Sequence, residues 1–174
     1  MCLIPGAAPL SGVTMQQLSM DDLAVKSTAI VRGRVVDSYS VLTGPTVYTH
    51  YHVAVADTWK GGASGTVDVA LPGGTVSGIR QTYPGVPQLN IGASYVLYLW
   101  TSSASGITMP TGFSQGIFAV SGDTPASLQL SRSATSELML GANGRPVQDK
   151  PVSMRLSEMK SQVASALAKV GSGR

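Results

Sequence analysis

The sequence predicts a mainly β domain with a short N-terminal helix and a C-terminal helix. Apolar residues alternate with polar ones over several runs between residues 28 and 132, which is the period of a β-strand. Clusters of Gly, Pro and Asn separate these runs as turns. The 174 residues fit one domain and are long enough to bury a core without a disulfide or a metal. We expect an irregular leader over 1–17 and a single β-barrel domain over 18–174.

The first elements are a short helix and a long hairpin. Ser19 is placed to cap the helix, with Asp21 and Asp22 in its first turn, where acidic groups favour the helix dipole. Two β-rich runs follow, over 28–42 and 46–59, with a turn signal between them.

Glycine positions and apolar runs indicate how the chain continues up to residue 100. Gly33 lies inside the first β-rich run, which indicates a bulge or sharp bend. A third strand is expected over 66–71. The Gly- and Pro-rich segment 72–92 reads as a long loop, and loops of this length are usually functional or mobile. The run 95–100 is apolar at every position, as in a strand covered on both faces.

The chain ends with short strands and a helix. Further strands are expected over 114–120 and 128–132, and the run 141–144 contains the Asn-Gly signal of a tight turn. Apolar residues then recur at helical spacing, and Gly171 ends the helix. These residues are Leu156, Met159, Val163, Leu167 and Val170.

The scattered positive charge argues against nucleic acid as a partner. The formal net charge is +3, and Arg32 with Arg34 is the nearest approach to a basic cluster. Nucleic-acid-binding proteins gather Lys and Arg into a stripe with interleaved aromatic residues. Two arginines at alternate positions are better explained as one solvated face of a strand.

Cys2 is the one cysteine, so no internal disulfide can form. No run approaches the ~20 apolar residues that span a bilayer, so no transmembrane segment is expected. The start of the sequence, a cysteine followed by Pro, Gly and Ala, resembles a processed bacterial lipoprotein. We therefore expect a secreted or periplasmic location, with a possible lipid anchor at Cys2.

The order of the segments along the predicted strands is informative. Val31–Val35 is followed by a strand that closes on Trp59-Lys60-Gly61, and Gly92–Leu99 comes later. This order resembles the OB-type barrel of netrin-like and TIMP-like domains, and a group of uncharacterised bacterial exported proteins with that barrel. The resemblance covers roughly residues 28–120 and implies an OB-like Greek-key barrel of about five strands. Those families are rich in disulfides and this chain is not, so their protease inhibition transfers poorly.

Gly112–Gly116 matches the G-x-S-x-G pattern of α/β-hydrolases around Ser114. That pattern needs a strand-to-helix turn and a partner histidine. Here a β-rich run follows instead, and both histidines precede the serine. The simpler interpretation is a glycine-flanked entry to a strand, with a serine hydrolase as an alternative.

His50 and His52 are the candidate metal ligands. Histidines at i and i+2 on a strand point the same way, so a metal ion can bridge them. A zinc site also needs a third ligand and often a carboxylate behind each histidine. Asp37 and Asp57 are the nearest acids in sequence, and strand pairing could bring Asp37 close. The alternative is a solvent-facing pair without metal.

The candidate binding residues lie in the 72–92 loop and on the adjoining strand. They are Tyr48, Tyr51, Arg80, Gln81 and Tyr83. OB barrels often bind ligands through loops and one sheet face, and tyrosine is common at interfaces. The alternative is that the loop covers a barrel end.

The function we expect is a non-catalytic binding module of an exported bacterial protein, with a protein or polymer ligand and no cofactor. The alternatives are a hydrolase that uses Ser114 or the two histidines, and an OB domain that binds single-stranded nucleic acid.

Overall fold

The computed structural model describes residues 14–135 and 137–172 and is mainly β with two α-helices, as predicted. The helices are α1 (Met20–Lys26) and α2 (Leu156–Gly171), with a short 3-10 helix, η1 (Phe113–Gly116). The strands are β1 (Thr14–Gln16), β2 (Ala29–Thr43), β3 (Thr46–Lys60), β4 (Thr66–Pro72), β5 (Gly74–Val76), β6 (Ile79–Gln81), β7 (Ser94–Thr101), β8 (Thr108–Pro110), β9 (Ile117–Ser121), β10 (Gln129–Arg132), β11 (Leu138–Leu140), β12 (Pro146–Val147) and β13 (Val152–Arg155).

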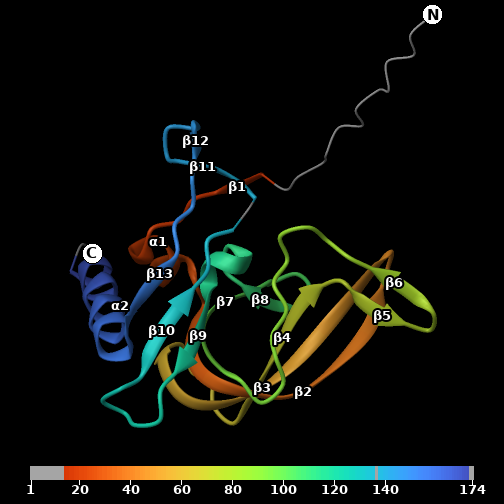
Figure 1. The fold of residues 1–174 in the computed structure, drawn as a ribbon, viewed down its shortest axis with the longest axis horizontal. Helices are drawn as coiled ribbons and strands as arrows, with labels where there is room; N and C mark the ends of the chain where they lie inside the picture. Colours follow the sequence, from red (N-terminus) through yellow and green to blue (C-terminus); the bar gives the residue numbers. More distant parts are fainter. Residues whose placement is uncertain (1–13, 136, 173–174) are drawn as a thin grey trace, which may run out of the picture.

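One large sheet dominates the fold. Its strand order is β13-β10-β9-β7-β2-β3-β4, and β8 pairs with β7 beside this path. The predicted long hairpin is confirmed as β2 and β3, which pair antiparallel along almost their whole length. Figure 1 shows that the sheet is strongly curved, with α1 and α2 at one end and β5–β6 at the other.

The sheet curls without closing. Among the described strands, β4 is the last in the hydrogen-bonded order, and it lies beside β8 without pairing with it. The closed OB-like barrel expected from the sequence is therefore not confirmed. The reason is topological, because within residues 14–135 and 137–172 the strand order gives no partner to the outer edge of β4.

Each face of the sheet has its own core. The concave face buries apolar side chains from β2, β3, β4, β7 and β9. The convex face packs against α1 and α2 through side chains that include Val96, Tyr98 and Phe118. The prediction that the strand around 95–100 is covered on both faces is thus confirmed, since Tyr95 and Leu97 belong to the first core.

The two helices form as their sequences predict. The Ser19 hydroxyl accepts a hydrogen bond from the Asp22 N–H, and the Asp22 carboxylate accepts one from the Ser19 N–H, which makes a capping box. In α2, Met159 and Val163 are buried against the convex face, while Val170 is exposed. Within the described part of the chain, neither helix has the length and apolar character needed to cross a bilayer.

Bulges in the long hairpin decide which residues face outward. The register shifts between Ile30 and Val31, then beside Gly33, as the glycine predicted, and a third time between Val35 and Asp37. At the third shift β2 carries Val36 as an extra residue, so that Asp37 lies opposite His52. The distal half of β2 therefore presents its odd-numbered residues on the convex face, beside His50 and His52.

Two regions that were expected to be irregular contain strands. Thr14–Gln16, inside the predicted leader, pairs parallel with β11. The segment 72–92, predicted as a loop without regular elements, contains the β5–β6 hairpin. Its turn has positive φ at both Ser77 and Gly78, which suits a two-residue hairpin turn. Cys2 lies outside the described residues.

Candidate functional site

Two histidine–aspartate pairs lie on the convex face of β2, β3 and β4, beyond the part that α1 and α2 cover. Nδ1 of His50 lies 2.8 Å from Oδ2 of Asp68 on β4. Nδ1 of His52 lies 2.6 Å from Oδ1 of Asp37 on β2. The central strand β3 thus supplies both imidazoles, and each neighbouring strand supplies one carboxylate.

Tyr39 completes this cluster from β2. Its ring stacks on that of His50, with centroids 5.0 Å apart and the planes 15° from parallel, and its centroid lies 5.4 Å from that of His52. Desolvation by its neighbours, together with the negative charges of Asp68 and Asp37, raises the pKa of the Tyr39 phenol.

The sequence identified part of this cluster. Asp37 was named as an acid that strand pairing could bring close, and the pairing of β2 with β3 places it beside His52. Asp57, the other acid nearest in sequence, instead accepts hydrogen bonds from Lys160 and from the indole of Trp59. Asp68 was not identified, because its contact with His50 depends on the diagonal pairing of β3 with β4.

A hollow of about 520 Å³ opens beside His50 and Asp68. It lies where β4 and the β7–β8 loop approach each other, and its other walls are small or hydroxyl-bearing residues such as Ser64, Thr66 and Thr108. The His50–Asp68 pair is its titratable part. The hollow gives solvent and small solutes access to the imidazole of His50, whose side chain is 15% exposed.

Gln81, a candidate binding residue of the 72–92 segment, joins two hairpins, and Tyr83 supports it. The Gln81 side chain accepts a hydrogen bond from the Val47 N–H at 2.7 Å and donates one to the Pro45 carbonyl at 2.8 Å. The Tyr83 hydroxyl donates to Oε1 of the same glutamine. Gln81 thus clamps the β5–β6 hairpin to the turn between β2 and β3.

The remaining candidates divide into exposed and buried residues. Arg80 is exposed, Tyr83 is 39% exposed, and Tyr48 is partly exposed on the convex face opposite Pro72. Tyr51 is 6% exposed and belongs to the concave core. It is therefore unavailable as a surface contact, because it shares the inward-facing register of Val53 on β3.

Ser114 lies in η1, not in the strand that was predicted to begin at this residue, and β9 begins three residues later at Ile117. Its Oγ is buried and has no hydrogen-bond partner. Both imidazoles are engaged with Asp37 and Asp68 on a different face of the molecule. The structure therefore brings no histidine to Ser114.

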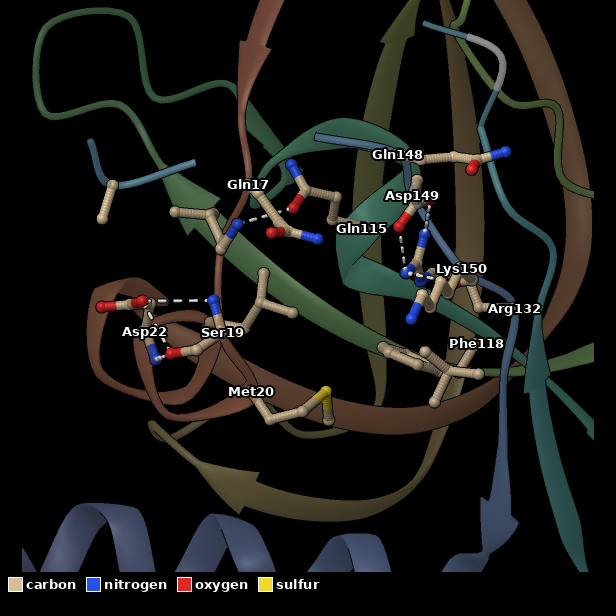
Figure 2. Close-up of a pocket in the computed structure, with 14 residues that line it drawn as sticks. Gln17, Ser19, Met20, Asp22, Gln115, Phe118, Arg132, Gln148, Asp149 and Lys150 are labelled. Carbon is tan, nitrogen blue, oxygen red and sulfur yellow. Dashed lines mark hydrogen bonds and ion pairs between the residues drawn. The ribbon is translucent and has the colours of Figure 1, made fainter. Parts of the chain in front are cut away.

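A second, larger hollow, of about 620 Å³, lies between β1, α1 and β13 (Figure 2). Three of the polar side chains that line it, those of Gln115, Arg132 and Asp149, already bind other groups of the protein. Gln115 accepts from the Leu18 N–H and donates to the Gln16 carbonyl, while Arg132 and Asp149 form a bidentate ion pair. These contacts fasten β1 and the segment before β13 onto the main sheet. We assign this hollow a structural role.

No protein family, curated protein or solved structure matches this chain in the comparisons.

Proposed function

We propose that this chain is a non-catalytic binding module of an exported bacterial protein. Its ligand is an extended segment of another protein, which binds as an added strand along the free edge of β2. This edge runs over residues 37–43, and we call it the β2 edge. The observation that carries the proposal is that, among the described strands, β2 has a neighbour on one side only over this range.

The pairing of β2 supports this proposal. β7 pairs with β2 from Ala29 to Arg34, and backbone bonds between Val35 and residues 92 and 93 extend the contact by one position. Beyond that point, among the described residues, β2 pairs with β3 alone. An edge strand with unpaired N–H and C=O groups is a template for a further strand.

The side chains of the β2 edge suit an interface. Tyr39, Val41 and Leu42 are exposed by 44%, 38% and 46%. The edge carries a single charge, Asp37, and no Lys or Pro, the residues that most often protect an edge from pairing. Tyr48 on β3 extends the same surface on the convex side.

The clamp by Gln81 supports binding by keeping the β2 edge rigid. β5 packs against β2 and β3, and Gly74 lies so close that an added Cβ would be 2.4 Å from the Thr49 hydroxyl and 2.7 Å from the Ser40 hydroxyl. A rigid edge loses little conformational freedom when a ligand docks, which lowers the cost of binding. Arg80 and Tyr83 of the clamped segment flank the surface and provide further contacts.

The strand order also supports an OB-type classification. The five strands β4-β3-β2-β7-β9 lie in one continuous sheet, and an OB-fold is a partly open Greek-key barrel of five strands. We propose that this chain has such a barrel, opened between its first and last strands. Exposed strands of such barrels serve as ligand-binding surfaces.

The test is capture of proteins from a bacterial envelope fraction on the immobilised full-length chain. Val41→Lys adds a charge to the β2 edge, and Val170→Lys makes the same change at an exposed valine on α2 as a matched control. We expect proteins that bind the parent and Val170→Lys to be lost from Val41→Lys. We also expect the amides of residues 37–43 to exchange hydrogen more slowly in the captured complex. Equal capture by both variants, with unchanged hydrogen exchange at residues 37–43, would rule out the β2 edge as the binding site.

A further inference from the structure

The imidazoles of His50 and His52 leave one nitrogen each for a ligand. Both Nδ1 atoms are used by carboxylates, at 2.8 Å and 2.6 Å. Within the described part of the chain, neither Nε2 atom has a hydrogen-bond partner. The two side chains project from the same face of β3, two residues apart, and His52 is 37% exposed.

The carboxylates select the tautomer that a metal ion requires. A carboxylate accepts a hydrogen bond, so it favours the proton on Nδ1 and leaves the lone pair on Nε2 free. This carboxylate–histidine arrangement orients metal-ligating histidines and makes their free nitrogen more basic. Both histidines have such a carboxylate on Nδ1, supplied by Asp68 of β4 and by Asp37 of β2.

The fold places one of these acids through an irregularity. If Val36 were paired in a regular ladder, the alternation along β2 would put Asp37 on the concave side, since Val35 is buried there. The bulge turns Asp37 toward His52 instead. Bulges are common next to functional sites, where they redirect a side chain.

We propose that His50 and His52 bind one divalent transition-metal ion through their Nε2 atoms, with Asp68 and Asp37 holding the two rings. Among the described residues, no group of three or more His, Cys, Asp and Glu side chains is arranged to hold a metal. The protein therefore supplies two ligands, and water or a donor group of a bound molecule supplies the rest. Imidazole favours transition metals over Mg²⁺ and Ca²⁺, and Cu²⁺ binds most tightly of the divalent first-row ions.

This site does not depend on the proposed function. Metal binding is measured on the purified chain without a protein ligand, and the histidine substitutions that remove it are on β3, outside the β2 edge. A chain that binds metal but captures no protein would support this inference and contradict the proposal that a protein ligand binds at the β2 edge.

The test is titration of the full chain with Cu²⁺, and separately with Zn²⁺, by calorimetry after treatment with a chelator. Every protein carries Cys2→Ser, because a free thiolate is itself a metal ligand. We expect one ion per chain in the parent. His52→Gln and the double variant His50→Gln/His52→Gln should lose this binding, and Asp37→Asn should weaken it by about 10- to 100-fold.

Spectroscopy distinguishes this site from a merely structural role of the histidines. The electron paramagnetic resonance spectrum of bound Cu²⁺ should show coupling to two imidazole nitrogens in the parent and to fewer in His52→Gln. The thermal unfolding of His52→Gln should match the parent, because this side chain is partly exposed. Equally tight binding of Cu²⁺ by the folded double variant, or no binding by the parent, would overturn the inference.

Discussion

Arg132 donates two parallel hydrogen bonds to Asp149, from Nη1 to Oδ2 at 2.6 Å and from Nη2 to Oδ1 at 3.0 Å. The two side chains are 11% and 3% exposed, so this ion pair is almost entirely removed from water. It joins β10 to the segment that leads into β13 (Figure 2).

Removing one partner of this ion pair should destabilise the fold strongly. Asp149→Ala leaves Arg132 buried without its counter-charge, and such changes cost about 3–5 kcal/mol. Asp123→Ala, at an exposed aspartate, should change the free energy of unfolding by less than about 0.5 kcal/mol. Urea unfolding of both variants checks this, and equal midpoints would contradict it.

The same carboxyl should contribute to acid unfolding. Burial alone raises the pKa of Asp149, but hydrogen bonds from Arg132 and from the Thr135 N–H outweigh it and hold the pKa below its usual value. The stabilisation is therefore complete above about pH 4, the ordinary aspartate range, and is lost as the pH falls through the folded-state pKa. Urea midpoints measured from neutral to acidic pH should fall less steeply in Asp149→Asn than in the parent.

Tyr98→Phe should leave the stability unchanged or increase it. The Tyr98 side chain is 0% exposed in the convex core, and its hydroxyl has no hydrogen-bond partner. A buried unsatisfied hydroxyl costs about 1–3 kcal/mol, and phenylalanine removes it while keeping the ring. A calorimetric melting temperature equal to or above that of the parent is expected. A fall of several degrees would mean that the hydroxyl has a partner.

Gly33→Ala should disrupt the bulge in the β2–β3 hairpin. A Cβ at this position would be 2.6 Å from both the Ala54 carbonyl oxygen and the Val53 side chain. We expect a loss of about 1–3 kcal/mol from overpacking. Gly62→Ala is the matched control, because a Cβ there meets no atom within 4 Å. In chemical denaturation, the unfolding midpoint of Gly33→Ala should lie clearly below that of Gly62→Ala.

Ser114 should be unreactive toward a fluorophosphonate probe. Its Oγ is buried, and no imidazole activates it. After incubation of the native chain, mass spectrometry should find residue 114 unmodified, and Ser114→Ala should give the same spectrum apart from its own mass change. Stoichiometric labelling of Ser114 would revive the hydrolase alternative.

Local patterns predicted most of the elements of this fold. The N-cap signal at Ser19 and the helical spacing of Met159 and Val163 are short-range signals, and both helices form where they indicate. The two-residue spacing of His50 and His52 correctly predicted that both lie on one face of a strand. Such signals depend on the few residues that surround them in the sequence.

Features that depend on pairing between distant strands were missed. The bulge residue Val36 gives no glycine signal, yet it decides that Asp37 faces His52. The contact of Asp68 with His50 needs the register of β4, and closure of the sheet depends on whether its outermost strands meet. Tyr51 was proposed as a contact from its residue type, while its position on β3 made it a core residue.

The missing ladder between β4 and β8 has a mechanical consequence. Since no backbone bond ties these strands together, the sheet can flatten or tighten without breaking any of its existing pairs. The Gln81 clamp holds the turn of the β2–β3 hairpin, so such a change would fall at the seam between β4 and β8.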